Sequence, residues 1–287
     1  MKRNCEAYNH ANAAYARIRA VDLLRYTIYE GNNMNPTISR FLKDCYKNYI
    51  PSIRIDVPEF PEKYFYPGGN PVRPVLPVQI AQNKIMIIGA FPSARFERRN
   101  GKLIPIADNL SPFSEEKYFD GREIRTQASR ESLNKNYFPQ LGIELNDLWI
   151  TDLVKIYLFP KKHIKNCREI SPHIEFVNTH KLFKKIAKSE SNIFWIKREI
   201  EICNPQFIIT LGEVPARVIS SDYKTKNKEL LNGSIREVYL NKKYKISHLA
   251  HPEIRRINKD WDEITKNAIK NLANKIKKLD LSKHGSV

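Results

Sequence analysis

Two side chains that can carry chemistry, those of Asp152 and His251, follow short apolar runs rich in β-branched residues. Carboxylates and imidazoles bind ligands through hydrogen bonds and act as acids or bases. Two similar runs lead into Pro92 and Gly212. Such runs are typical of parallel strands that are buried on both faces, and ligands bind at the carboxyl edge of such sheets. We therefore expect these four residues to converge on one crevice.

The elements that must position this crevice alternate between strands and helices from about residue 84 onward. Strands are expected at 84–89, 148–154, 206–211 and 244–249. Helical patterns cover 126–140, 171–203, a stretch from about 214, and 260–279, and 91–125 is expected to be a long loop. The pair Asn232-Gly233 predicts the turn of a small hairpin. The alternation predicts a three-layer α/β/α fold around a four-stranded parallel sheet.

The first 80 residues are expected to form an N-terminal helical and proline-rich extension that packs on the core. Apolar residues at helical spacing predict helices over 11–30 and 36–49. Residues 51–80 hold seven of the 17 prolines, together with several aromatic residues, which predicts an extended strap. The chain would then divide into the extension, 1–80, and a catalytic domain, 81–287. Whether the extension widens a binding surface or shapes the crevice stays open.

The charge balance points to a polyanionic partner. The 287 residues include 49 Lys and Arg against 31 Asp and Glu, a formal net charge of +18. Neutralised phosphates release counterions, which supplies much of the affinity of nucleic-acid-binding proteins. A lysine-rich surface without such a partner is the alternative. Basic clusters lie at 95–102, 155–165, 181–188 and 255–259, and three of them follow an expected strand.

The sequence gives no signal for a membrane, an export route or a metal. No apolar run approaches the roughly 20 residues that span a membrane, and the N-terminus lacks the apolar centre of a signal peptide. The four cysteines form no C-x-x-C pair, so neither a zinc ribbon nor an iron–sulfur cluster is indicated. We therefore expect a cytoplasmic protein without a metal or cofactor, and we infer no obligatory protein partner and no membrane contact.

Five motifs in order along 84–280 resemble those of the uracil-DNA glycosylase superfamily. They are Gly89–Ser93 (a G-x-x-P element), Ser111–Ser114 (an aromatic in a P-F-S element), Ile150–Lys155, Pro205–Gly212, and His251–Glu253 (an H-P-S-like loop). The resemblance implies a DNA glycosylase, an enzyme that flips its target base into a closed pocket. Hydrolysis of the N-glycosidic bond would then leave an abasic site. The iron–sulfur branches of the family are not matched, because Ile156 stands where one thiolate would be.

The resemblance also implies roles for the aromatic and histidine residues. Phe113 would be the platform on which the flipped base stacks, and Phe91 would flank the same pocket beside Gly89 and Ala90. His251 would donate a hydrogen bond to the base oxygen that gains charge as the bond breaks. For Phe113, a role in the core without contact to substrate is the alternative.

The carboxylate that this chemistry needs is not in its usual place. Most relatives have Asp, Asn or Glu inside the G-x-x-P element, where this chain has two apolar residues. A branch of the family resembles this arrangement and uses an Asp further downstream. Asp108 is the natural counterpart, with Asn109 as a weaker substitute, and Glu97 and Asp120 remain open. A loop Asp that only caps a turn is the alternative for Asp108.

Asp152 is the position that says most about the target base. Uracil-specific relatives have Asn there, whose amide both donates and accepts. An ionised carboxylate only accepts, so it suits the exocyclic amine of cytosine and repels uracil O4. If burial keeps it protonated, it can also donate. The resemblance therefore points to a cytosine-type base, including the modified cytosines of phage DNA. An Asp that pairs with Lys155 or Arg217 outside the pocket is the alternative.

The remaining candidates are contacts to the DNA backbone. Ser93, Arg95 and Lys155 follow expected strands, and Arg255 and Arg256 lie in the loop that would enter the duplex. The sequence thus predicts a metal-free DNA glycosylase in repair or in defence against modified phage DNA. A glycosylase for uracil or hypoxanthine is one alternative. A catalytically silent member that only binds DNA is another.

Overall fold

The structure is a computed structural model that describes residues 35–67, 69–99, 102–108, 111–114, 117–119 and 124–276. Side chains are described for these residues except at 94–108, 117–119, 124–125 and 256. The expected helix at 11–30 and the candidate Asn109 lie outside the described residues. No helix in the described ranges is long and apolar enough to cross a membrane.

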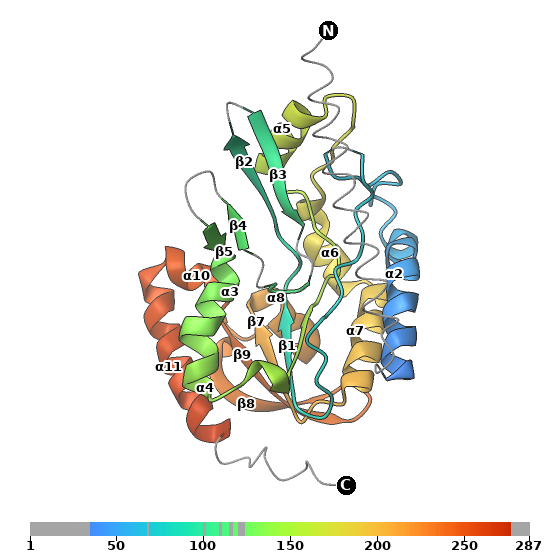
Figure 1. The fold of residues 1–287 in the computed structure, drawn as a ribbon. Helices are drawn as coiled ribbons and strands as arrows, with labels where there is room; N and C mark the ends of the chain where they lie inside the picture. The colour runs from blue at the N-terminus through green and yellow to red at the C-terminus, as the bar shows by residue number, and fades with distance from the viewer. Residues whose placement is uncertain are drawn as a thin grey trace.

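A five-stranded sheet lies at the centre of the part that the structure describes, in the order β6-β1-β7-β9-β8 (Figure 1). Its parallel strands are β1 (Ile85–Gly89), β6 (Leu148–Asp152), β7 (Phe207–Leu211) and β9 (Lys243–Leu249). These agree with the four expected strands within one or two residues. The α/β class and the mostly parallel sheet are confirmed.

The predicted number of four strands is wrong, because β8 (Asn232–Tyr239) adds an antiparallel edge strand beside β9. Asn232 and Gly233 begin this strand instead of forming a hairpin turn. Six of the eight residues of β8 are partly buried or exposed, and the strand carries no continuous apolar run that would identify it. Gly233 has φ +72°, and a Cβ there would lie 2.2 Å from the carbonyl oxygen of Ala268. Glycine thus allows the last helix to approach this edge.

Helices cover both faces of the sheet and make the expected three layers (Figure 1). On one face α2 (Pro36–Asp56) packs against α7 (Glu190–Cys203), and the core there includes Met86 and Ile88 of β1. On the other face α3 (Ala128–Ser132), a π-helical turn (Leu133–Tyr137), α4 (Phe138–Leu141) and α11 (Lys259–Ile276) cover Ile85 and Ile87. The alternation along β1 therefore supplies both cores.

The expected continuous helix over 171–203 is wrong. The chain there forms a 3-10 turn (Thr179–Leu182), α6 (Phe183–Lys188) and then α7. Ser189 separates the two helices, and its hydroxyl accepts from the backbone N–H of Asn192 at 3.3 Å, which caps α7. A preceding helix, α5 (Lys161–Ile170), had no prediction. The remaining helices are α8 (Glu213–Ser220), α9 (Asn227–Leu230) and α10 (Pro252–Ile257).

The region before the sheet contacts the core through its whole described length. Helix α2 continues past Pro51 to Asp56, seven residues beyond the expected end at 49. The predicted strap over 51–80 is therefore wrong for its first six residues, which are helical. The described residues from 57 to 81 form turns, irregular chain and isolated bridges, one of which pairs Ile80 with Trp149 of β6. The side chains of Phe41, Leu42 and Tyr49 are fully buried in this layer.

The segment 91–125 is not the long loop that was expected. Its described residues form two antiparallel hairpins, β2 (Ala94–Arg99) with β3 (Lys102–Asp108), and β4 (Lys117–Phe119) with β5 (Ile124–Thr126). The first hairpin projects from the sheet beside α5 (Figure 1). Strand β2 is rich in arginine, and Pro105 interrupts the apolar run of β3, so neither strand has the signature of a buried parallel strand.

Candidate active site

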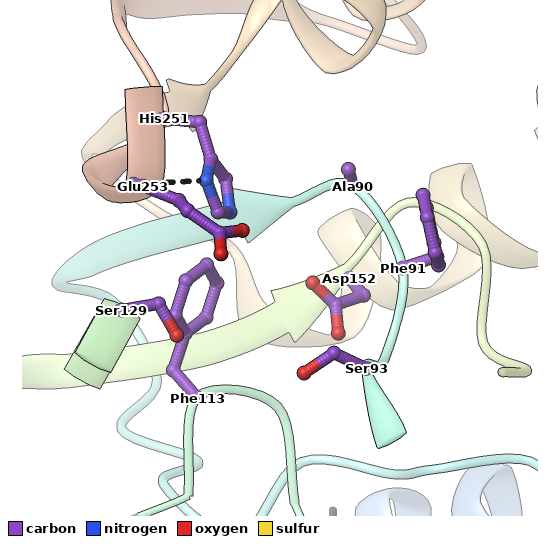
Figure 2. A pocket seen from close by; sticks show the side chains of 8 residues that line it. All are labelled: Ala90, Phe91, Ser93, Phe113, Ser129, Asp152, His251 and Glu253. Atoms are coloured by element: carbon purple, nitrogen blue, oxygen red, sulfur yellow. Dashed lines mark hydrogen bonds between the residues drawn. The ribbon is translucent and has the colours of Figure 1, made fainter. Parts of the chain in front are cut away.

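A cavity of about 270 Å³ opens at the carboxyl edge of the sheet. Figure 2 shows the side chains that face it from the ends of β1 and β6, from the start of α10 and from the chain around α3. The lining residues are Ala90, Phe91, Ser93, Phe113, Ser129, Asp152, His251 and Glu253. Asp152 and His251, which the sequence predicts to converge, therefore line one cavity. Gly212 is adjacent, since a Cβ there would lie 3.5 Å from His251 Cβ.

The absence of a side chain at Gly89 lets Asp152 and Phe113 approach each other at the wall of the cavity. A Cβ at this position would lie 2.2 Å from Asp152 Oδ1 and 2.5 Å from Cε2 of Phe113. Gly89 pairs in register with Asp152, and the backbone N–H of Leu153 donates to Gly89 O at 2.9 Å. Any side chain here would displace the carboxylate or the aromatic ring.

Phe113 is held in a strained turn. Its φ is +49°, which non-glycine residues rarely adopt, and the backbone N–H of Ser114 closes the turn onto Ser111 O at 3.1 Å. The buried Arg130 guanidinium of α3 donates to Phe113 O at 3.1 Å. The Phe113 ring lies 5.9 Å from the His251 ring, between centroids, at an interplanar angle of 35°. A strained backbone that several contacts hold is typical of ligand sites.

Phe91 lines the opposite part of the cavity and leans on a small aromatic cluster. Its ring centroid lies 4.7 Å from that of Phe183 and 5.4 Å from that of His180. Phe91 therefore joins the cavity to α6 and the 3-10 turn before it, which carry exposed lysines.

Asp152 ends β6 with its carboxyl group directed into the cavity (Figure 2). The residue is 3% exposed, and none of the described residues donates a hydrogen bond to its carboxylate oxygens. Burial raises the pKa of Asp152 from 3.8 to about 7, partly opposed by Lys155 and assisted by Glu199. At neutral pH the group is therefore poised between an acceptor-only carboxylate and an acid that can also donate.

Lys155 is not on a DNA-binding surface, which corrects the sequence-based prediction. Its side chain is fully buried and forms an ion pair with Glu199 of α7. The ammonium also donates to Thr151 Oγ1 at 2.5 Å and to the backbone oxygen of Asp152 at 2.7 Å. The alternative in which Asp152 pairs with Lys155 is not realised either, because Lys155 contacts the main chain of Asp152 and pairs with Glu199.

His251 is the N-cap of α10, and this contact sets its tautomer. Its Nδ1 accepts from the backbone N–H of Glu253 at 3.2 Å, so the ring proton resides on Nε2. Burial lowers the pKa of His251, which keeps the ring neutral near pH 7. His251 therefore offers the cavity a single N–H donor.

Glu253 adds a second carboxylate to the cavity, and sequence reasoning missed it as a site residue. Figure 2 shows its carboxylate between His251 and Phe113, on the side opposite Asp152. Glu253 is exposed, whereas Asp152 is buried, so Glu253 marks the mouth and Asp152 the closed end. Its position two residues after His251 is the feature of the sequence that could have identified Glu253 as a site residue. Ser129 of α3 was also missed, because no motif includes it.

Two further predicted residues, Asp108 and Ser93, lie at or near the rim of the cavity. Asp108 ends β3, and its backbone pairs with Ala94, the neighbour of the cavity-lining Ser93. The backbone of Asp108 therefore lies at the rim of the cavity. The side chains of Asp108, Arg95 and Arg256 are not among those that the structure describes. Ser93 is exposed and lines the cavity, as a contact to substrate requires.

Arg255 is the second correction to the predicted DNA contacts. It is 7% exposed, its Nε donates to Asp262 Oδ1 at 2.6 Å, and its guanidinium lies 5.6 Å from the centroid of the Tyr137 ring. These contacts join α10 to α11 and to the π-helical turn. Arg255 thus holds the loop after β9 and is not available for a phosphate.

Metal-ligand geometry is not found in the part of the chain that the structure describes, where no three His, Cys, Asp or Glu residues gather. Cys45, Cys167 and Cys203 are free and buried. Burial raises the pKa of Cys167 to about 12, so this thiol is not poised as a nucleophile.

Comparison with models of protein families identifies the family of the chain. Residues 78–277, well over half of the chain, match the model of the Uracil DNA glycosylase superfamily. The matched range begins just before β1 and ends after α11, so it includes all five strands and every residue of the cavity. No curated protein matches the sequence.

Proposed function

The chain belongs to the uracil-DNA glycosylase superfamily, and from this premise we propose that it excises a flipped cytosine-type base from DNA, including modified cytosine. The superfamily generally hydrolyses N-glycosidic bonds in DNA, and its substrate fits the net charge of +18. The observation that carries the choice of base is the carboxyl group of Asp152 at the closed end of the cavity, where relatives that act on uracil have an amide.

The flipped base would stack on the Phe113 ring and turn its hydrogen-bonding edge toward Asp152. Stacking of a base on an aromatic ring contributes about 1–3 kcal/mol and does not distinguish bases. Discrimination therefore depends on Asp152. As a carboxylate it accepts from the N4 amine of cytosine, and as an acid it also donates to N3. Uracil O4 needs a donor, which only the protonated form supplies.

Hydrolysis moves charge onto the leaving base and leaves an oxocarbenium-like sugar. The Nε2–H group of His251 would donate to the base oxygen as that oxygen gains charge, without transferring a full proton from an imidazolium. Because the imidazole is neutral near pH 7, the same donor is present before and during bond cleavage.

A carboxylate on the sugar side would stabilise the oxocarbenium ion and orient the attacking water. The base occupies the closed end, so the sugar remains at the mouth, which is where Glu253 lies. Asp108, at the rim beside Ser93, is the candidate that the family resemblance favours. We propose that Asp108 orients the water and that Glu253 adds negative charge at the sugar.

The experiment is a single-turnover excision assay on matched oligonucleotides. They carry cytosine, 5-hydroxymethylcytosine, glucosylated 5-hydroxymethylcytosine, uracil or hypoxanthine, and alkali converts each abasic site to a strand break. Excision of a cytosine-type base with little release of uracil supports the proposal. If the protein prefers uracil or hypoxanthine, the proposed target base is wrong and that base takes its place. If it binds DNA without excising any base, it is a catalytically silent DNA-binding member of the family.

A further inference from the structure

A buried ion pair lies directly beneath the base-reading residue. Lys155 and Glu199 are both fully buried, and Lys155 is three residues after Asp152. The ammonium uses its three hydrogens on Glu199 Oε2, on Thr151 Oγ1 at 2.5 Å and on Asp152 O at 2.7 Å. The Lys155 side chain thus ties the main chain of Asp152 to helix α7.

Glu199 is saturated in the same way. Its carboxylate accepts from Lys155, from Trp149 Nε1 at 2.8 Å and from Thr151 Oγ1 at 3.2 Å. Trp149 and Thr151 belong to β6, the strand that ends in Asp152. A buried pair of this kind is often no more stabilising than apolar residues of the same size, so stability alone does not explain it.

The region before the sheet holds the same segment from the other side. The hydroxyl of Tyr49 in α2 accepts from the backbone N–H of Lys155 at 3.1 Å and donates to Asn192 of α7 at 2.5 Å. The backbone N–H of Val75 donates to Lys155 O at 2.6 Å. Both backbone groups of Lys155 are therefore bound by residues 36–80.

We propose that Lys155 and Glu199 are a positioning pair, braced by Tyr49, which fixes the Asp152 carboxyl at the closed end of the cavity and controls its charge. The proposal rests on the proposed function, since it explains how the residue that reads the base is set. It also gives residues 36–80 a role, as a support of the pocket.

The charges around Asp152 predict opposite effects for the two members of the pair. Lys155 favours the ionised carboxylate, and Glu199 disfavours it. From the remaining elements, Tyr49 and Cys45 of α2 face this network, and His251 and Glu253 lie across the cavity. With the ring of His251 neutral near pH 7, Lys155 and Glu199 are the charges among these groups that shift the pKa of Asp152.

The test is a titration of the Asp152 carboxyl by ¹³C NMR, with Asp152→Asn to assign the signal. Glu199→Gln keeps the size and leaves Lys155 unopposed, so the pKa of Asp152 should fall by about one unit or more. Lys155→Met should raise it by a similar amount. Arg198→Met is the matched control, because Arg198 is also on α7 and pairs with Asp44 of α2, but both side chains are about a third exposed. It should leave the titration unchanged.

Equal titration in all variants, or shifts of the same sign for both members of the pair, would overturn the proposal. If Lys155→Met does not fold, Glu199→Gln and Tyr49→Phe still decide it. Tyr49→Phe keeps the ring and removes the brace, and it should lower the single-turnover rate about fivefold at unchanged DNA affinity. A rate equal to wild type would remove Tyr49 from the proposal.

The titration needs no enzymatic activity. An excision assay without product would therefore refute the proposed function, while the NMR result would still show whether the pair controls Asp152. Conversely, robust excision with an unchanged titration would refute only the positioning pair.

Discussion

The two sides of the cavity are built in opposite ways. On the closed side, Asp152 is 3% exposed and its strand end is bound to α2, to α7 and to the strap before β1. On the open side, His251 and Glu253 begin α10, a helix of six residues, and Glu253 is exposed. Arg255 links this short helix to α11 through Asp262.

The difference matches the two tasks of a base-excising enzyme. Recognition of a base edge needs donors and acceptors that do not move, because a mismatch must leave a buried group unpaired. The side that meets the sugar and the duplex must accept a large ligand. We infer that specificity is set by the closed side and reactivity by the open side.

The largest expected effect comes from a side chain at Gly89, in the space between Asp152 and Phe113. Gly89→Ala puts a methyl group where Asp152 Oδ1 and the Phe113 ring now lie, so excision should fall by about a thousandfold or more. Single-turnover assays measure this loss. Gly142→Ala is the control: its φ is +66° but nothing lies within 4 Å, so it should cost stability without loss of excision. Equal losses in both variants would show that strain, not the site, is responsible.

The next effect concerns the two carboxylates at the rim. Asp108→Asn should lower the single-turnover rate by about a hundredfold or more with DNA affinity kept, the usual scale for an acid–base group. Glu253→Gln should lower it less, by about tenfold, because it loses only a charge near the sugar. If Asp108→Asn is silent and Glu253→Gln is not, their roles are reversed. Neither change should alter the preference among bases, and a changed preference would break the division between the two sides.

The sequence was sufficient for the parallel strands and the pocket because their apolar runs must be buried on both faces. It was insufficient where burial depends on a partner in a separate helix. Lys155 is buried only because Glu199, 44 residues later, faces it, and Arg255 because Asp262 does. Residue type alone predicts an exposed cation at both positions.

Half-exposed elements were missed for a related reason. Strands β8 and β2 are mostly polar, and Pro105 interrupts the apolar run of β3, so these strands resemble loops in a search for apolar runs. Glu253 was overlooked because the family motif has no carboxylate at that place, although its distance from His251 was visible in the sequence.

A third prediction uses the raised pKa of Asp152. Between pH 4 and 7 the unfolded chain releases this proton while the native state keeps it, so the wild type loses stability as the pH rises. Asp152→Asn has no such group. Its free energy of unfolding relative to wild type should therefore increase by about 2–3 kcal/mol from pH 5 to pH 8. Urea unfolding at both values measures this, with the exposed Asp260→Asn as control. No change would mean that Asp152 is not buried as described.

The smallest expected effect is electrostatic. Several phosphate contacts should give a slope of several units in a plot of log affinity against log salt concentration. Lys184 of α6 is exposed beside Phe183, which packs on the cavity residue Phe91. Lys184→Ala should reduce the slope by about one unit, while Lys270→Ala on α11 should not. A slope near zero for the wild type would contradict a largely electrostatic mode of DNA binding.

The most direct test of the account replaces one carboxyl oxygen of Asp152, at the closed end of the cavity, by an amide nitrogen. Asp152→Asn restores one donor and one acceptor, the pattern that matches uracil, and should shift the ratio of excision rates from cytosine-type base toward uracil. An unpaired polar group in a closed pocket costs about 1–3 kcal/mol, so we expect a shift of about 5- to 150-fold. If the wild type already prefers uracil, or if the ratio does not move, Asp152 does not read the base and the cytosine assignment is wrong.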